Sequence, residues 1–370
     1  MNIQSRNISL DVFRGLTICF MIIVNTPGNG ECVYAPLRHA HWHGFTPTDL
    51  VFPSFVFAVG NAIFFGMKSF QTMASSDVYK RILKRTAIIF LCGFLLYWFP
   101  FVQHTEQGWG LSPFSHTRIL GVLQRIALAY GIGALLIYKL NIKAIWAVAV
   151  AFLLLYWLLL ATGGDYTMLG HLGQKIDMAI LGEHHMYHGE GLAFEPEGIL
   201  STLPSIVNVL AGYLTAHYLM SNGGIDKNKL MRLAIAGFGL LLISWGWNVW
   251  FPINKKLWTS SFVLHTVGWD LIILSIISYL VDILKFTTGT RFFQTAGRNP
   301  LFIYLLSELL ITLLSIFHTG SGVSWAGAIY QNIFAHAGCY LGSFLFAIAY
   351  MLLCWSAGWW LNKKGVYIRA

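Results

Sequence analysis

The densest group of side chains that could carry out chemistry lies in the N-terminal part of the chain. Three histidines alternate at His39, His41 and His43, with Asn25 before them and Asp49 after them. Residues at alternate positions do not share a face of a helix, so the histidines are expected in an extended or irregular loop. A neutral imidazole that lies near carboxylate and amide groups can act as a general base. The stretch therefore predicts proton chemistry centred on a histidine.

The elements that must position this loop are membrane helices. The chain has 370 residues, of which 56% are hydrophobic and only 11% are charged. A soluble protein carries roughly a quarter of its residues as charge, so this composition excludes a water-soluble protein. Helices are expected because a backbone in lipid must satisfy its own hydrogen bonds, and the fold class is all-α, a polytopic transmembrane helix bundle. About ten apolar runs are long enough to span, and they cover residues 9–27, 49–67, 82–100, 119–138, 144–161, 201–220, 232–250, 259–281, 299–317 and 340–361.

The basic residues predict the orientation of these spans. An even number of spans places both termini on one side, and most of the 24 lysines and arginines fall in loops on that side. Because cytoplasmic loops are enriched in basic residues, both termini are expected in the cytoplasm and the His39 loop on the periplasmic side of an inner membrane. This bias explains the formal charge of +9 and leaves no contiguous basic patch for a nucleic acid. The exceptions on the outer side are Arg38, Arg118, Arg125, Lys175, Lys255 and Lys256.

Residues 162–200 form the longest outer segment and are expected to make a small subdomain of an otherwise single transmembrane domain over 1–370. The segment contains His184, Tyr187, His188 and Glu197. His184 and His188 would share a face if the piece were helical, but a third ligand at a recognised spacing is lacking. We therefore interpret the segment as a polar lid over a cleft and expect no metal.

Four other residues allow more than one interpretation. Asp270 and Glu308 fall within predicted spans, where each is either a structural hydrogen-bonding group or part of a proton or substrate pathway. Cys32 and Cys339 both fall on the outer side, where a disulfide is chemically possible. The first apolar run is interpreted as a retained helix and not as a signal peptide.

Six blocks dispersed along the chain resemble the heparan-α-glucosaminide N-acetyltransferase family. Together with Asn25, they cover nearly the whole chain in order. The blocks are LDVFRG at 10–15, HAHWHGFT at 39–46, DLVFP at 49–53, RILGVLQR at 118–125, PEGILST at 196–202 and GRNP at 297–300.

The resemblance implies a membrane acyltransferase, because family members use acetyl-CoA to N-acetylate a terminal glucosamine across a membrane. His39 matches the family's active-site histidine, and Asn25 and Asp49 match the polar residues that accompany it. Acetyl transfer to an amine needs a base and a donor to the tetrahedral oxyanion. His39 would be the base, Asp49 would orient its ring and Asn25 would donate to the oxyanion. Transient acetylation of His39 is the other possibility.

The two substrates are expected to approach from opposite sides. Acetyl-CoA is made inside the cell, and its phosphates favour a basic inner surface. The candidates for that surface, which could equally be ordinary inner anchors, are Arg14, Arg298, Asn299, Lys363 and Lys364. The candidates for binding the amino sugar or glycan are Trp42, His184, Tyr187, Glu197 and Glu308.

The alternative function is a carrier that moves an amino sugar such as N-acetylglucosamine across the inner membrane. Asp270 and Glu308 keep this alternative open, because a proton-coupled carrier needs acids within the membrane. A carrier would also show an internal inverted repeat, and we find no convincing repeat between residues 1–185 and 186–370. A purely structural membrane protein is the third possibility, and the His39 loop argues against it. A homodimer would fit the family.

Overall fold

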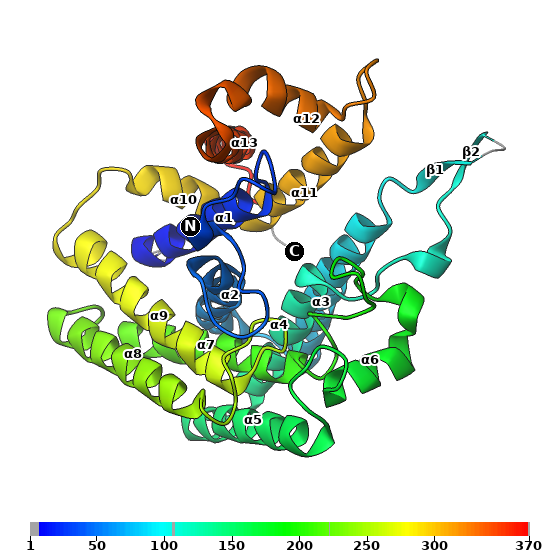
Figure 1. The fold of residues 1–370 in the computed structure, drawn as a ribbon. Helices are drawn as coiled ribbons and strands as arrows, with labels where there is room; N and C mark the ends of the chain where they lie inside the picture. The colour runs from blue at the N-terminus through cyan, green and yellow to red at the C-terminus, as the bar shows by residue number, and fades with distance from the viewer. Residues whose placement is uncertain (1–6, 106–107, 222, 369–370) are drawn as a thin grey trace.

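The computed structural model describes residues 7–105, 108–221 and 223–368. This part of the chain is almost entirely helical (Figure 1), which confirms the all-α fold class. The long helices are α1 (Ile8–Asn25), α2 (Pro47–Phe70), α3 (Ser75–Trp98), α4 (Val122–Lys139), α5 (Ile142–Gly163), α7 (Thr202–Met220), α8 (Lys227–Trp247), α9 (Ser260–Ser278), α11 (Pro300–Ile316) and α13 (Cys339–Lys363). The shorter helices are α6 (Leu172–Leu181), α10 (Thr290–Arg298) and α12 (Trp325–Ile329).

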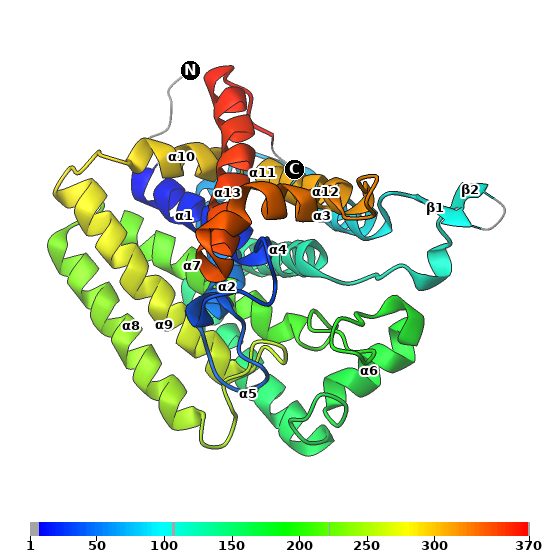
Figure 2. The ribbon, with the colours of Figure 1, turned by 45° about the horizontal axis from the view of Figure 1, so that its top comes forward.

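One antiparallel hairpin interrupts the helices. Its strands are β1 (Val102–Thr105) and β2 (Gly108–Leu111), with Val102 paired to Leu111. Figures 1 and 2 both show the hairpin projecting away from the helices. It therefore takes no part in the packing of the bundle.

Each predicted span coincides with a helix, but the helices differ in how well they suit a membrane. Among the described residues, seven helices are long and apolar enough to cross one, namely α1, α2, α4, α5, α8, α13 and α9 with its extension to Ile283. Helices α10 and α11 meet at a bend of 80° and would together make an eighth. Basic residues in the first half of α3, and polar ones such as Asn208 in α7, keep these two helices outside that set. The chain is a multi-pass membrane protein, while the number of ten spans and the cytoplasmic termini stay predictions.

Helices α1 and α2 lie in the middle of the molecule, with α8 and α9 on one side and α3 and α4 on the other (Figure 1). Helix α2 packs against α7 through glycines on both helices. A Cβ atom on Gly60 would lie 1.9 Å from the backbone oxygen of Val209, and one on Gly212 would lie 2.0 Å from that of Phe57. Small residues let membrane helices approach backbone to backbone, so this contact fixes the position of α2 and of the loop before it.

We predict that Gly60→Ala destabilises the protein by about 1–3 kcal/mol, because the added methyl group overpacks the contact between α2 and α7. Thermal unfolding in detergent measures the effect. Gly66→Ala is the matched control on the same helix, because a Cβ atom there meets nothing within 4 Å. Equal unfolding temperatures for the two variants would contradict the prediction.

Candidate active site

The loop between α1 and α2 is irregular, as predicted, apart from a 3-10 turn at Ala35–Leu37. Arg38 folds the loop on itself by donating from Nε to the Val33 oxygen over 2.9 Å and from a terminal nitrogen to the Glu31 oxygen over 2.7 Å. The Thr46 hydroxyl donates to the Arg38 oxygen over 2.7 Å. The conformation that presents His39 therefore depends on side chains that bond the loop's own backbone.

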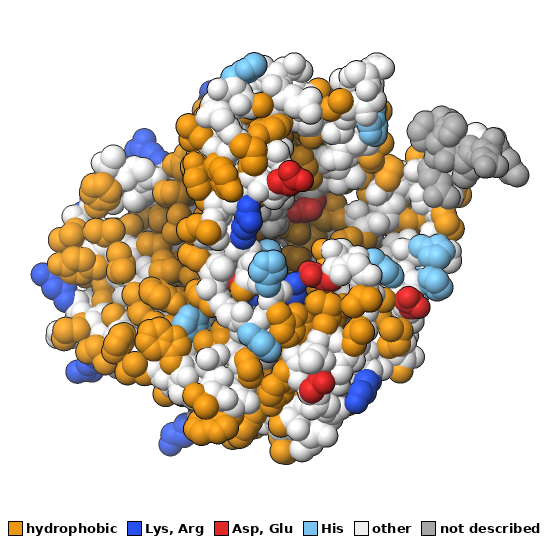
Figure 3. Space-filling model, in the orientation of Figure 1, with side chains coloured by type: hydrophobic (Ala, Val, Ile, Leu, Met, Phe, Trp, Pro, Cys, Tyr) orange, Lys and Arg blue, Asp and Glu red, His pale blue; other side chains and the backbone are white. Residues whose placement is uncertain are grey.

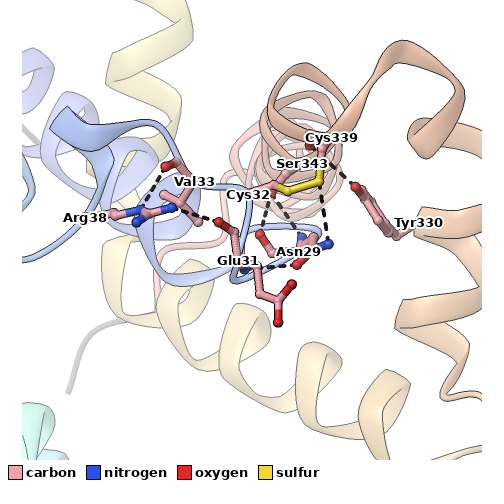
Figure 4. The surroundings of a disulfide bond; sticks show 8 residues. All are labelled: Asn29, Glu31, Cys32, Val33, Arg38, Tyr330, Cys339 and Ser343. Atoms are coloured by element: carbon pink, nitrogen blue, oxygen red, sulfur yellow. Dashed lines mark hydrogen bonds between the residues drawn. A yellow bond between two sulfur atoms is a disulfide. The ribbon is translucent and has the colours of Figure 1, made fainter.

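A disulfide ties the same loop to α13. Cys32 bonds Cys339, the first residue of α13, across a sequence separation of 307 residues (Figure 4). Next to it, the backbone N–H of Asn29 donates to the Ser343 hydroxyl over 3.0 Å, and that hydroxyl donates to the Asn29 oxygen over 3.0 Å. The structure thus forms the disulfide that the sequence left open, and it joins the His39 loop to a third helix.

His39 and Asp49 form the central contact of the site. Nδ1 of His39 lies 2.7 Å from Oδ1 of Asp49, which is 1% exposed in the first turn of α2. The other carboxylate oxygen accepts from the backbone N–H groups of Ala40, over 3.1 Å, and Thr46, over 3.0 Å. Because the carboxylate accepts, Nδ1 of His39 carries the hydrogen and Nε2 carries the lone pair. The side chain of His39 is 44% exposed, so this lone pair is accessible to a substrate.

Lys255, in the loop between α8 and α9, is the nearest cation to this pair. Its Nζ lies 3.1 Å from Nδ1 and 3.2 Å from Nε2 of His39, and 3.9 Å from Oδ1 of Asp49. The pKa of Lys255 lies below its ordinary value because burial disfavours the ammonium, although Asp49 and Glu197 act in the opposite direction. Lys255 was not predicted to be a site residue, since 216 residues separate it from His39.

Further bonds hold the α8–α9 loop against the His39 loop. The Gly44 N–H donates to the Ile253 oxygen over 2.8 Å, and Nδ2 of Asn254 lies 3.3 Å from Nδ1 of His43. Nζ of Lys256 lies 3.0 Å from the backbone oxygen of His41 and 2.6 Å from a carboxylate oxygen of Glu190. Residues 39–44, 190 and 253–256 therefore form one connected structure.

A second charged group is built on Arg118. Its Nε donates to Glu195 over 2.9 Å, and one terminal nitrogen donates both to Glu195 and, over 2.6 Å, to Glu197. The guanidinium also lies 4.9 Å from the ring centre of Tyr97 and 4.8 Å from that of Tyr187. Tyr187 and Glu197, both predicted to bind the acceptor, are thus brought together by an arginine that was not predicted to be a site residue.

One guanidinium faces two carboxylates in this group, and the two titrate differently. Burial raises the pKa of Glu195 to about 7 against the opposing effect of Arg118. Burial also acts to raise the pKa of Glu197, but the charges of Arg118, Arg125 and Lys255 outweigh it and hold that pKa below its ordinary value. Glu197 is therefore the carboxylate that stays anionic near neutral pH.

Residues from α4 and α6 position the Glu197 segment. Asp177 of α6 is 2% exposed and accepts from the Ile199 N–H over 2.8 Å. Arg125 of α4 is 1% exposed, donates to the Ser201 hydroxyl and lies 4.7 Å from the ring centre of Trp258. The block at 196–202 is thus held from two helices, which explains why a loop can place a carboxylate at a fixed point.

Asp177 predicts a pH dependence of stability. Burial raises its pKa from 3.8 to about 6, so between these values the folded protein binds a proton that the unfolded chain does not. Stability therefore falls as the pH rises through this window. We expect the unfolding temperature of Asp177→Asn, measured across pH 4 to 7 in detergent, to depend less on pH than that of the parent protein. An unchanged pH profile in the variant would contradict the assignment.

Asn25 and Glu308 form a third group. The side chain of Asn25, the last residue of α1, lies close to Glu308 in α11 and interacts with it. The first two groups are linked by charge, because Lys255 interacts electrostatically with Asp49 and Glu197. Glu308 interacts electrostatically with Tyr97, whose ring contacts Arg118. We refer to His39, Asp49, Lys255, Arg118, Glu195, Glu197, Asn25 and Glu308 as the central site. Figure 3 shows acidic, basic and histidine side chains gathered around a hollow in the middle of this face, with hydrophobic surface at the left of the view.

Comparison with known proteins agrees with this arrangement. Residues 6–251, more than half of the chain, match a family model described as heparan-alpha-glucosaminide N-acetyltransferase, catalytic. The chain belongs to this family. It is 29% identical over 361 residues to the human heparan-alpha-glucosaminide N-acetyltransferase and 29% identical over 364 residues to the mouse protein, covering 81% of this chain in each case. It spans about half of each relative, 52% and 53% of their lengths.

Membership of the heparan-alpha-glucosaminide N-acetyltransferase family bears on the alternatives. Neither the family nor these relatives favour an amino-sugar carrier. The matched range contains His39, Asp49, Arg118 and Glu197, whereas Lys255 lies just beyond its end. The geometry therefore adds a residue to the site that the family match does not cover.

The remaining acceptor candidates lie in other surroundings. His184 belongs to the 3-10 turn Glu183–His185 and contacts the ring of His116, with 4.8 Å between ring centres. Trp42 donates from its indole nitrogen to the Tyr166 oxygen over 2.8 Å. Trp42 also lines an open groove of about 360 Å³ together with His43, Tyr166, Thr167 and Met168.

Most of the residues predicted to bind acetyl-CoA form contacts that hold the ends of helices together. Arg14 lies 3.6 Å from Asp11 and donates to the Gly297 oxygen over 3.1 Å. Arg298 donates to Asn362 over 2.9 Å. Asn299 is fully buried and bonds the backbone of Val366 and Ile368 over 3.1 and 2.9 Å, so its amide fastens the C-terminal segment. Lys363 and Lys364 are exposed at the end of α13, each beside a tryptophan ring.

Proposed function

We propose that the chain is a membrane-embedded N-acetyltransferase that moves an acetyl group from acetyl-CoA to the amine of a glucosamine-type sugar or glycan. The observation that carries the proposal is the His39–Asp49 pair, in which a buried carboxylate holds an exposed imidazole with its lone pair accessible. The names of the human and mouse relatives support the choice of amine acceptor. Family membership supports the reaction class.

The chemistry follows from this pair. A glucosamine amine is largely protonated near neutral pH and must lose a proton before it can attack a thioester. Nε2 of His39 takes that proton, and Asp49 stabilises the imidazolium through Nδ1. The amine then attacks the acetyl carbonyl and loses its second proton, and the tetrahedral intermediate breaks the carbon–sulfur bond. The CoA thiolate takes up a proton, so the products are the N-acetyl sugar, CoA thiol and one proton released to water. In the two-step alternative, Nε2 itself attacks the thioester and passes the acetyl group to the amine.

Carboxylates around His39 suit an amino sugar. Glu197 stays anionic and can pair with the incoming ammonium, while Glu308 can accept from sugar hydroxyls. The amide of Asn25 interacts with Glu308, and its N–H groups can donate to the oxyanion. The sugar units beyond the reacting glucosamine contact Trp42, Tyr187 and His184.

The two substrates meet the protein from opposite sides of an inner membrane. The His39 loop faces the periplasm, and the other end of the bundle, with Arg14, Arg298, Asn299, Lys363 and Lys364, faces the cytoplasm and the phosphates of acetyl-CoA. Lys363 and Lys364 are the most accessible of these residues.

The test uses purified full-length protein in detergent with acetyl-CoA labelled in the acetyl group. With glucosamine as acceptor, we expect labelled N-acetylglucosamine, identified by chromatography and mass spectrometry. Glucose is the matched control, because it keeps the ring and hydroxyls and lacks the amine. Absence of product with glucosamine and with glucosamine-terminated oligosaccharides, or equal labelling of glucose, would overturn the proposal.

A further inference from the structure

Lys255 carries an amine directly beside the imidazole that would activate an acceptor amine. For His39 to remove a proton from an acceptor, the acceptor nitrogen has to lie within hydrogen-bonding distance of Nε2. Nζ of Lys255 lies 3.1 Å from Nδ1 and 3.2 Å from Nε2, so it sits over the imidazole ring, and rotation of the lysine side chain brings it to the lone pair of Nε2. It is also close to Asp49 and interacts electrostatically with Glu197, the anion expected to attract an acceptor ammonium. We propose that Lys255 is a self-acetylation site, which accepts an acetyl group from acetyl-CoA when no sugar is bound.

The inference rests on the proposed function and extends it to a covalent modification. A lysine amine and a glucosamine amine present the same reacting group to a thioester. The Lys255 ammonium loses one proton to Nε2 of His39, and its nitrogen forms a bond to the acetyl carbon. The carbon–sulfur bond breaks, the second amine proton leaves, and the CoA thiolate takes up a proton. The products are acetyl-lysine, CoA thiol and one proton released to water.

The surroundings of Lys255 favour this reaction. Its side chain is 21% exposed, so it is partly accessible to a substrate. Its lowered pKa increases the fraction of neutral, nucleophilic amine. Its backbone is fixed by Asn254, which is fully buried and accepts from the Leu257 N–H over 2.8 Å. The fixed backbone at Lys255 therefore keeps its amine close to His39.

Acetylation would change the site in two ways. It removes the positive charge beside Asp49 and Glu197, and it adds an acetamide where the acceptor amine binds. We expect the modified protein to acetylate glucosamine at least tenfold more slowly than the unmodified protein. The modification would thus limit the enzyme when acetyl-CoA is abundant and the acceptor is absent.

Lys256 is a matched internal control. It is the next residue, its side chain is 17% exposed, and its Nζ is held 2.6 Å from Glu190, away from the His39 ring nitrogens. Chemical acetylation by a thioester in solution does not use His39, so its yield on either lysine would be the same in the parent protein and in His39→Ala. Acetylation that depends on His39 would label Lys255 alone.

The experiment incubates the full chain with acetyl-CoA that carries a ¹³C-labelled acetyl group and without sugar. A protease that does not cut at lysine releases a peptide containing both lysines, and tandem mass spectrometry locates the label. We expect at least tenfold more label on Lys255 than on Lys256, a fall to the Lys256 level in His39→Ala, and protection by excess glucosamine. Hydroxylamine, which removes acetyl groups from imidazole, should leave this label in place.

Three outcomes would overturn the inference: equal labelling of the two lysines, labelling of Lys255 that glucosamine does not reduce, or no label on Lys255 while glucosamine is acetylated. In the last case the proposed function would stand. Protection by glucosamine is measured on the parent protein, so the test does not depend on whether His39→Ala folds. Failure of both sugar and lysine acetylation would count against the proposed function as well.

Discussion

Replacing His39 by alanine should lower the rate of acetyl transfer to glucosamine by about 10²–10⁴-fold, the usual contribution of a general base. The expected loss is in kcat, because His39 acts on the proton of a bound amine. Asp49→Asn should cost less than His39→Ala, since the imidazole remains while the charge that stabilises its protonated form is gone. Initial rates with labelled acetyl-CoA measure both variants.

His41→Ala is the control for the His39 prediction. His41 is exposed in the same loop, and its link to the site is its backbone oxygen, which the substitution keeps. The control should therefore retain the parent rate within a factor of about 2, and its folding can be checked by its unfolding temperature. A His39→Ala protein that is folded and as active as His41→Ala would exclude His39 from the reaction.

Local spacing explains why the His39–Asp49 pair could be predicted. His39 and Asp49 are ten residues apart, and Asp49 lies in the first turn of a helix that follows the loop directly. Its carboxylate is therefore expected near the loop. Asn25 was predicted for the same group from the resemblance, but its side chain interacts with Glu308 on α11. The sequence has no signal for which helices face each other at such a point.

Contacts between residues far apart in the sequence were not predicted, for the same reason. Lys255 is 216 residues from His39, and Arg118 is 77 residues from Glu195. A usable signal did exist, because Arg118, Arg125, Lys255 and Lys256 are four of the six basic residues that the predicted orientation places on the outer side. All four contact the site or its supporting loops. Basic residues that oppose the orientation bias are therefore better candidates than those that follow it, such as Arg298, which here bonds Asn362 at the end of α13.

Every predicted span coincides with a helix. Among the described residues, however, only seven helices, or eight with the bent pair, are long and apolar enough to cross a membrane. Hydropathy located every long helix because each needs an apolar face for lipid or for its neighbours. It did not reveal that Thr290–Arg298 and Pro300–Ile316 are two helices bent by 80°, with Asn299 between them. Pro300 is a local signal for this break, because the residue before a proline is disfavoured in the helical region. Bonds from Asn299 to the backbone of residues 366 and 368 fasten the C-terminal segment at the bend.

Arg118→Met should lower the free energy of unfolding by about 3–5 kcal/mol, the range found when one partner of a buried ion pair is removed. The substitution keeps much of the side-chain volume against Tyr97 and Tyr187 but leaves Glu195 and Glu197 without the guanidinium. Burial then disfavours both charges, and the segment that carries Glu197 loses its main contact. Thermal and denaturant unfolding in detergent measure the change.

A second substitution separates charge from packing. Glu195→Gln added to Arg118→Met removes one of the two uncompensated carboxylates, so it should recover part of the lost stability, whereas transfer to glucosamine should stay impaired because Glu197 is still misplaced. Lys175→Met, at an exposed lysine of α6, should change stability by no more than about 0.5 kcal/mol. If Arg118→Met unfolds at the parent temperature, the Arg118 group does not hold the Glu197 segment, and acceptor recognition must then depend on Lys255, Glu308 and the walls of the hollow.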